Sequence, residues 1–475
     1  YSIWILDVEN RNMEKIDLGN NKEKSRFIVG PWSLNKNGFY VLSDLKREFI
    51  GIAFYNIEKS ELEWIHTPSH DIELIDISSD GKLLVWTENI DGYSKLYVKD
   101  IENQKITEIV PTIATPNNST STYNSTTYNN SISFTHLDGV IENLKLSTDG
   151  KRIGVMMDCP TSPTNIYIID QNKSEQNNIN NCIKIGTSLF GNLSDNALIK
   201  PQLIKYKSFD ALEISAFLYI PNNTNFKKIN GKTDKKFGAV LSIHGGPTAQ
   251  ERPYYDYSGL YQYLAHNDLV VIAPNFRGST GYGKNFEKKI YHDWGGNELK
   301  DLEYAIKWLL SQNWIDPKRI GVFGGSFGGF ATLSCITRLP QYDWKAAVDI
   351  VGPSNLVTFV KTVPRHWQNL TFELVGNPEK EERFLKERSP ITFVDNTNPQ
   401  TSLLVIQGAN DPRVAKDESD QIVKRLKDKG IDVEYMIFED EGHGFTKYDN
   451  QIKALKKSAE FLKEKISQNI KEKNE

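Results

Sequence analysis

Apolar and polar positions alternate along the second part of the chain in the way that an α/β fold requires. Short continuous apolar runs, typical of strands buried on both faces, are separated by longer amphipathic stretches. The runs cover residues 237–243, 269–273, 319–323, 346–350, 402–406 and 433–438. After the run at 269–273, Asn297 precedes a helical repeat of apolar residues that starts at Leu299, and is predicted to cap that helix. This pattern predicts an α/β domain with a doubly wound sheet over residues 200–475.

The first part of the chain has a different pattern, in which strand-like stretches flank short turns. Asn37-Gly38, Asp80-Gly81 and Asp149-Gly150 each precede a β-rich run, and Asx-Gly between such runs is a strong hairpin signal. The spacing of 43 residues from Gly38 to Gly81 is typical of a propeller blade. Residues 1–195 are therefore predicted to form an all-β propeller domain.

The predicted propeller contains a long insertion and has few blades. A polar segment rich in Asn, Ser, Thr and Tyr, about residues 112–132, lengthens the next spacing to 69 residues and is expected to be a mobile loop. About 195 residues supply only three to four blades, which is fewer than a closed ring usually contains. We therefore expect the propeller to be partial in this chain, with further blades before Tyr1 in a longer natural protein.

The composition, the net charge and the number of cysteines indicate which partners and which compartment to expect. The chain has 475 residues, 39% of them hydrophobic and 25% charged, and a formal net charge of −4. These values are typical of globular proteins and favour neither a nucleic-acid nor a membrane partner. The three cysteines, Cys159, Cys182 and Cys335, are too few for a disulfide framework, which favours a reducing, cytoplasmic compartment.

A candidate nucleophile stands at the end of the run 319–323. The sequence Gly324-Gly325-Ser326-Phe327-Gly328 reads G-x-S-x-G, with strand-like residues before it and helix-compatible residues after it. A nucleophile elbow needs this context, because the serine backbone is strained and side chains two residues away would clash. Ser326 is therefore the predicted nucleophile.

An acid and a histidine follow, each just past a predicted strand. Asp411 follows the run 402–406, and His443 follows the run 433–438. The carboxyl ends of parallel strands share one edge of a sheet, and the order Ser, Asp, His is that of an α/β-hydrolase. His443 is predicted to take the proton of Ser326, and Asp411 to orient the imidazole, with Asp440 as the first alternative acid.

Oxyanion donors can also be located. The N–H of Phe327 directly follows the nucleophile, and His244-Gly245-Gly246-Pro247 follows the strand-like run 237–243. An HGG-type loop after that strand usually supplies the second N–H, here assigned to Gly246 with Gly245 as the fallback.

Together these motifs resemble those of the prolyl oligopeptidase family of serine peptidases, nearest its acylaminoacyl-peptidase and dipeptidyl-aminopeptidase-like branch. The matching stretches lie in family order across about residues 200–465. They include His244-Gly245-Gly246-Pro247, Asn275-Phe276-Arg277-Gly278-Ser279, Arg388-Ser389-Pro390, Gln407-Gly408-Ala409-Asn410-Asp411 and Glu441-Gly442-His443-Gly444-Phe445. The resemblance implies a hydrolase domain preceded by a propeller, and peptides as substrates. His244 stands near a tyrosine position of other branches, which favours a backbone oxyanion donor.

The resemblance also implies a substrate-binding role for Arg413, which follows the acid by two residues and would hold a substrate carbonyl. A local salt bridge or a loop contact is the alternative role. Phe359, Trp367 and Phe372 lie between the serine strand and Asp411. They are candidates for an apolar specificity pocket, with core packing as the alternative. For the stretch from Arg277 to Gly283 we expect a structural role beneath the site.

The predicted activity is that of a serine peptidase acting on short or N-blocked peptides, without metal or cofactor. Two other functions remain open: an esterase or lipase on the same scaffold, and a catalytically inert propeller interaction protein. The intact triad argues against the inert protein. Whether the chain cuts within peptides or from their ends, and whether it forms a homo-oligomer, stays open.

Overall fold

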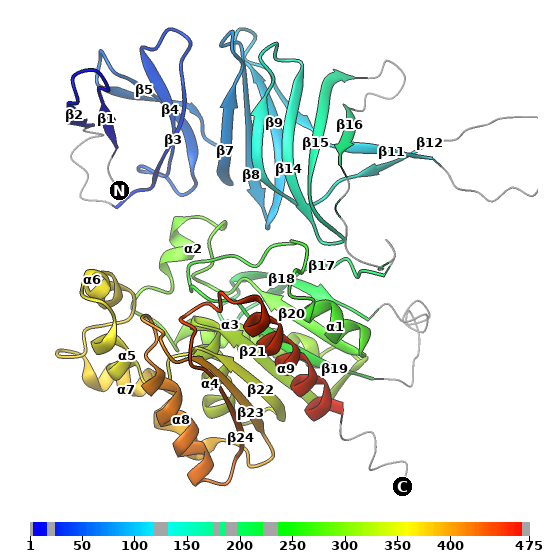
Figure 1. Cartoon of the computed structure of the whole chain (residues 1–475), viewed down its shortest axis with the longest axis vertical. Coiled ribbons are helices and arrows are strands. Elements are labelled where there is room, and N and C mark those ends of the chain that lie inside the picture. The colour runs from blue at the N-terminus through cyan, green and yellow to red at the C-terminus, as the bar shows by residue number, and fades with distance from the viewer. Residues whose placement is uncertain are drawn as a thin grey trace, which may run out of the picture. The chain divides into compact units, whose positions relative to one another are not determined.

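The computed structural model describes residues 3–16, 24–116, 132–173, 180–186, 188, 193, 197–221 and 236–467. The chain divides into two compact units (Figure 1). The first unit comprises Tyr1–Asp195 with the short segments Arg252–Tyr255 and Gly281–Asn285. The second unit comprises Asn196–Glu251, Asp256–Thr280 and Phe286–Glu475.

The first unit is built of mainly antiparallel sheets in which most neighbouring strands are successive, the exception being the parallel pair of β11 and β16. Two sheets have four strands each, in the orders β3-β4-β5-β6 and β10-β9-β8-β7. The third has six strands, in the order β12-β11-β16-β15-β14-β13, and among the described residues β1 and β2 form a separate two-stranded sheet. The strands are β1 Trp4–Leu6, β2 Met13–Lys15, β3 Phe27–Trp32, β4 Gly38–Ser43, β5 Gly51–Asn56, β6 Glu61–His66, β7 Asp71–Ile77, β8 Leu83–Ile90, β9 Tyr93–Asp100, β10 Ile106–Ile109, β11 Thr112–Pro116, β12 Ile132–His136, β13 Val140–Leu146, β14 Arg152–Cys159, β15 Ser162–Lys173 and β16 Asn180–Ile185. Such four-strand meanders are the blades of a β-propeller.

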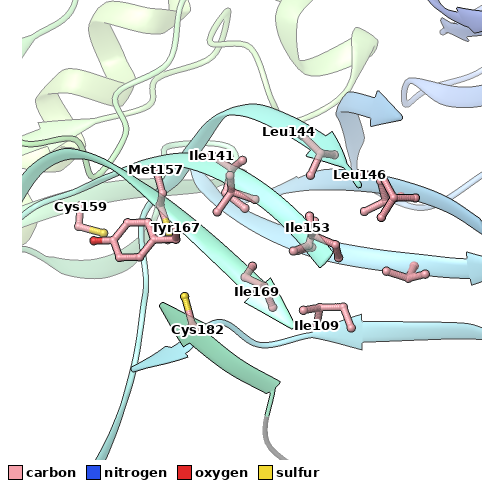
Figure 2. Packing of buried hydrophobic residues seen from close by; sticks show 14 residues of the cluster. Ile109, Ile141, Leu144, Leu146, Ile153, Met157, Cys159, Tyr167, Ile169 and Cys182 are labelled. Atoms are coloured by element: carbon pink, nitrogen blue, oxygen red, sulfur yellow. The ribbon is translucent and has the colours of Figure 1, made fainter. Parts of the chain in front are cut away.

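Apolar side chains join neighbouring meanders. Figure 2 shows one such cluster, in which Ile109 of β10 lies with Ile141 of β13, Ile153 of β14 and Ile169 of β15. Strands β4 and β8 are buried at nearly every position, so both faces of their sheets are covered and the sheets stack face to face.

The three Asx-Gly turns lie where the sequence predicts them, between β3 and β4, between β7 and β8, and between β13 and β14. Gly81 and Gly150 have φ values of 73° and 69°, which explains the preference for glycine there. The expectation of a loop over 112–132 is wrong at both ends. Thr112–Pro116 and Ile132–His136 are the strands β11 and β12, which pair through main-chain hydrogen bonds that polar side chains do not prevent. Residues 117–131 lie outside the described part of the chain.

The second unit is a sheet of eight strands flanked by helices, in the order β17-β18-β20-β19-β21-β22-β23-β24. Strands β19 to β24 are mutually parallel, whereas β18 is antiparallel to both of its neighbours, β17 and β20. This is the doubly wound α/β sheet that the apolar runs predict. The strands are β17 Gln202–Lys207, β18 Glu213–Tyr219, β19 Phe237–Ile243, β20 Leu269–Pro274, β21 Ile315–Gly325, β22 Trp344–Ile350, β23 Ser402–Gly408 and β24 Asp432–Phe438.

All the helices except α9, which follows the last strand, lie between strands of this sheet in the sequence. No helix among the described residues has the length and apolar content needed to cross a bilayer. The helices are α1 Leu260–His266, α2 Lys284–Lys288, α3 Asn297–Leu310, α4 Phe327–Arg338, α5 Leu356–Thr362, α6 Arg365–Leu374, α7 Glu382–Arg388, α8 Lys416–Asp428 and α9 Tyr448–Ser467, with a 3₁₀ helix over Pro390–Asn396.

The prediction that Asn297 caps α3 is wrong. Gly296 occupies the N-cap position without a side-chain cap, and Asn297 is the first helical residue. The carboxylate of Glu298 instead accepts the N–H of Gly295 and of Gly296, the latter at 2.9 Å. These two amides precede the helix, and the N–H of Asn297 in the first turn donates to Asp293 Oδ2 at 3.0 Å. Side chains other than that of Asn297 therefore satisfy the amides at the start of α3.

Candidate active site

Ser326 lies in the sharp turn between β21 and α4, with φ 57° and ψ −119°. Its N–H donates to the carbonyl of Ile350 at 2.8 Å. A Cβ on Gly324 would lie 2.3 Å from the carbonyl oxygen of Gly328, and one on Gly328 would lie 2.0 Å from that of Ile243. Both glycines are therefore required for the turn to close, as the G-x-S-x-G pattern predicts.

Three side chains from three loops form a hydrogen-bonded chain at the carboxyl edge of the sheet. His443 Nε2 lies 2.9 Å from Ser326 Oγ, and His443 Nδ1 lies 2.7 Å from Asp411 Oδ2. The other oxygen of Asp411 accepts the backbone N–H groups of Arg413 and Val414 at 2.8 and 2.9 Å. Since an ionised carboxylate only accepts, Nδ1 carries the proton and Nε2 is free to accept that of the serine.

Asp440, the alternative acid, lies apart from this chain. It forms an ion pair with Lys447, and half of its side chain is exposed. The neighbouring Glu441 is buried and has a contact that the sequence analysis missed. Its carboxylate accepts the N–H of Thr446 at 2.8 Å and of Lys447 at 3.0 Å, so it closes the loop that carries His443. An acid two residues before the histidine was the available signal.

The His244-Gly245-Gly246 loop passes beside the nucleophile. A Cβ on Gly245 would lie 3.0 Å from the carbonyl oxygen of Gly325 and 3.5 Å from Ser326 Cβ. Gly246 has φ 119° and borders the same cavity as Ser326 and His443. Phe327 is the first residue of α4, where the N–H groups have no partner within the helix.

His244 fixes the start of this loop. Its ring is stacked on Phe276 with centroids 4.4 Å apart, Nδ1 donates to the carbonyl of Gly245 at 2.8 Å, and Nε2 lies 2.9 Å from Ser279 Oγ. Burial lowers the pKa of His244 to about 4, so the ring is neutral at physiological pH. His244 is thus a fixed support of the glycine loop.

An apolar cavity of about 280 Å³ opens beside Ser326. Two of the predicted pocket residues, Phe359 and Trp367, line it, whereas Phe372 does not. Apart from Ser326 and His443, its lining residues are Gly246, Trp294, Phe359, Val363, Trp367, Leu370, Thr371, Leu374, Val375, Arg413 and Val414. A cavity of this composition accepts a bulky apolar group next to the serine.

Arg413 lies at the rim of this cavity with its guanidinium over the ring of Trp367, 5.1 Å from the centroid. No ion pair of Arg413 occurs within the described part of the chain. A stacked guanidinium keeps its N–H donors available at its edge.

Trp294 is the aromatic residue of the cavity that the sequence analysis missed. It is buried, and its ring contacts Phe327 edge-on at 4.7 Å and is stacked with Phe359 at 6.0 Å. Its only local signal is the Asp-Trp-Gly-Gly sequence before α3. That sequence does not show which way the indole points.

Arg277 has a structural position, as expected. It is buried and donates to both oxygens of the fully buried Asp301, with Nε–Oδ2 and Nη2–Oδ1 distances of 2.8 Å. It also contacts the half-exposed Asp210 through Nη1 and Nη2. The network ties the strand end after β20 to α3 and to the turn after β17.

The fold and the Ser326–His443–Asp411 arrangement together define an α/β-hydrolase unit preceded by propeller blades. Residues 255–469 match the family model described as the prolyl oligopeptidase family, and this part of the chain is a domain of that family.

The relatives in this family are peptidases. The dipeptidyl aminopeptidase BIII of Pseudoxanthomonas mexicana is 39% identical over 263 residues, which cover 54% of this chain and 37% of that enzyme. The acylamino-acid-releasing enzyme of Arabidopsis thaliana is 30% identical over 226 residues, covering 46% of this chain and 28% of that enzyme. The matched segments thus span well under half the length of these relatives.

Solved structures show the same fold over nearly the whole length of this chain. A puromycin-hydrolyzing peptidase of Mycobacterium tuberculosis superposes with a TM-score of 0.75 at 23% identity, over 96% of this chain and 64% of that one. An acylaminoacyl peptidase of Pyrococcus horikoshii gives a TM-score of 0.72 at 21% identity, over 98% and 68%. The expected fold class, propeller blades followed by an α/β-hydrolase unit, is confirmed.

Proposed function

We propose that the chain is a serine peptidase that hydrolyses short peptides through an acyl-enzyme on Ser326. The observation that carries the proposal is the unbroken hydrogen-bonded chain from Ser326 through His443 to Asp411, at the mouth of an apolar cavity. Family membership of residues 255–469, and relatives named as dipeptidyl aminopeptidase and acylamino-acid-releasing enzyme, support peptides as the substrates.

Each residue has a role that its geometry allows. Ser326 Oγ attacks the scissile carbonyl while His443 Nε2 takes the proton and later gives it to the leaving amine. Asp411 holds the imidazole in the tautomer that can accept at Nε2. The N–H groups of Phe327 and Gly246 donate to the oxyanion of the tetrahedral intermediate. Water then attacks the acyl-enzyme by the same route.

The cavity suggests which residue precedes the cut. Trp294, Phe359 and Trp367 present aromatic surface beside Ser326, and Leu370 and Leu374 extend it. Burying an aromatic or large aliphatic side chain here would stabilise the complex, at about 25 cal/mol per Å² of apolar surface. We therefore propose aromatic and large aliphatic residues at this position.

A substrate panel tests this function. Free-amine dipeptides, acetylated amino acids and blocked prolyl peptides, all as p-nitroanilides, would be compared with p-nitrophenyl acetate. Side chains before the cut would range from alanine to phenylalanine. We expect peptide turnover that rises with side-chain size and disappears in Ser326→Ala, which should also lose fluorophosphonate labelling. Turnover of the ester alone would favour the esterase, and labelling that persists in folded Ser326→Ala would contradict the assignment of the nucleophile.

Arg413 is proposed to hold a carbonyl of the substrate residue that precedes the acyl residue. Arg413→Lys keeps the charge but loses the planar set of donors, so peptides should lose about 1–3 kcal/mol of transition-state binding. Small esters that end at the acyl group should be nearly unaffected. Equal losses on peptide and ester would instead indicate a loop contact that disturbs Asp411. Arg383→Lys, on the exposed surface of α7, is the matched control.

A further inference from the structure

Trp294 forms a wall of the cavity beside Ser326, yet it belongs to a loop that ends in two glycines. The loop Asp293-Trp294-Gly295-Gly296 enters α3, and the indole packs on Phe327 and Phe359. A tryptophan on such a loop keeps its position only if the backbone is held, because glycine restricts the chain least.

Several contacts hold this backbone from different elements. Arg338 Nη1 of α4 donates to the Gly295 carbonyl at 2.6 Å, and Asp293 pairs with Arg388 Nη2 at 3.0 Å. The N–H of His292 donates to the carbonyl of Leu374, a cavity residue at the end of α6, at 2.8 Å. The loop is therefore tied to α4, to the end of α7 and to the cavity itself.

The contact at the centre of the loop comes from Glu298. Its carboxylate accepts the N–H groups of Gly295 and Gly296, one on each oxygen, directly after Trp294. The side chain is 1% exposed, and burial raises its pKa to about 7. A carboxylate in this position is costly to bury, and two amide donors together with the start of a helix offset part of that cost.

The close packing at Gly295 and Gly296 leaves no room for a side chain at either position. Gly295 has φ 67°, and a Cβ there would lie 2.7 Å from Arg338 Nη1. A Cβ on Gly296 would lie 2.0 Å from Asp293 Oδ1. The loop is thus packed closely around the two amides that Glu298 binds.

We propose that Glu298 is a positioning residue for substrate selectivity: by binding the Gly295 and Gly296 amides it fixes Trp294 as a wall of the pocket that receives the side chain before the cut. The inference rests on the proposed function of that pocket. This role differs from that of a simple helix cap. Loss of a cap would lower the folding stability and would change the reaction with every substrate equally. Loss of the Glu298 carboxylate should instead slow the reaction only of substrates whose side chain contacts Trp294.

The test uses two covalent probes that need no peptide cleavage. Peptidyl diphenyl phosphonates react when Ser326 Oγ forms a bond to phosphorus and phenoxide leaves, and they carry a chosen group where the side chain before the cut would lie. One probe carries a benzyl group and the other a methyl group. Second-order inactivation rates would be measured for wild type, Glu298→Gln and Glu303→Gln. Glu303 lies on the same helix and pairs with Lys307, so Glu303→Gln is the matched control.

Glu298→Gln replaces one acceptor by an NH₂ group that faces an N–H donor. We expect the rate with the benzyl probe to fall about tenfold, about 1.4 kcal/mol, while the methyl probe changes by less than about twofold. Glu303→Gln should leave both rates unchanged. Equal losses with both probes, or no loss with either, would overturn the proposal. Should Glu298→Gln fail to fold, Arg338→Lys would be measured instead, because it shortens the side chain that donates to the Gly295 carbonyl. It should show the same selective loss with the benzyl probe. In this variant too, equal losses with both probes, or no loss with either, would overturn the proposal.

Failure of the proposed function gives a different result. A wild-type chain that reacts with the probes but cleaves no peptide would refute the peptidase, and the rate ratio would still decide the role of Glu298. A wild-type chain that reacts with neither probe would refute the site itself, and the inference with it.

Discussion

The orientation of Asp411 makes Asp411→Asn the sharpest test of the triad. One carboxylate oxygen accepts the Arg413 and Val414 amides, and the other faces His443 Nδ1 at 2.7 Å. In the variant the amide oxygen must keep the two N–H donors, so the NH₂ group is turned towards His443. The imidazole can then only accept at Nδ1, which places its proton on Nε2, towards Ser326. The base is lost while the geometry is kept.

The expected loss is large because the tautomer, not the position, has changed. In the serine-protease template the same exchange lowers kcat about 10⁴-fold, which corresponds to about 5 kcal/mol at 1.36 kcal/mol per factor of ten. The assay is kcat on the best p-nitroanilide of the panel, with Ser326→Ala as the background. Asp440→Asn, whose side chain only pairs with Lys447, should remain close to wild type. A loss below about tenfold in Asp411→Asn, or an equal loss in Asp440→Asn, would refute this reasoning.

Two further predictions concern stability. Arg277→Met should lower the free energy of unfolding of the hydrolase unit by about 3–5 kcal/mol, because it leaves the fully buried charge of Asp301 without its cation, whereas the half-exposed Asp210 adds little. A urea titration followed by fluorophosphonate labelling measures this, and a change below about 1 kcal/mol would show that the network is weak. For Asp349, burial raises the pKa to about 8 from its ordinary 3.8, so the folded chain keeps a proton that the unfolded chain loses. This contribution to stability is complete below about pH 4 and is lost as the pH rises to about 8. Between pH 6 and 8 wild type should therefore lose about 2–3 kcal/mol relative to Asp349→Asn, at about 1.4 kcal/mol per pH unit, and parallel urea midpoints in the two proteins would contradict it.

The apolar runs and the Asx-Gly turns were sufficient to predict the fold class from the sequence. Each apolar run from 237–243 to 433–438 is a strand of the sheet, with the edge strand β24 only partly buried, and each Asx-Gly turn joins two antiparallel strands. These features depend on neighbours in sequence, because the apolar pattern of a strand and the geometry of a tight turn are set within a few residues. The error at 112–132 has the same origin, since main-chain pairing between β11 and β12 leaves no pattern in side-chain polarity.

The part of the candidate site that was predictable from the sequence is the set of residues on loops at one edge of the sheet. Ser326, Asp411 and His443 each follow a parallel strand, and such strands bring their carboxyl ends together whatever their order. The substrate roles of Arg413, Trp367 and Phe359 stay predictions. The rotation of α6 about its axis decides which of its aromatic residues reaches the cavity. Trp367 lines the cavity and stacks on Arg413, whereas Phe372 of the same helix does not line it.

Tertiary structure alone decided what lies around these residues. The sheet order places β20 between β18 and β19, and it joins Arg277 to Asp301 and Asp210, which lie 24 and 67 residues away. It also buries Asp349 and turns Trp294 towards Phe327 rather than towards solvent. A sequence encodes which side chains can be buried or charged. The partner that satisfies each of them is fixed only when the whole sheet packs, because burial and pairing are properties of neighbours in space.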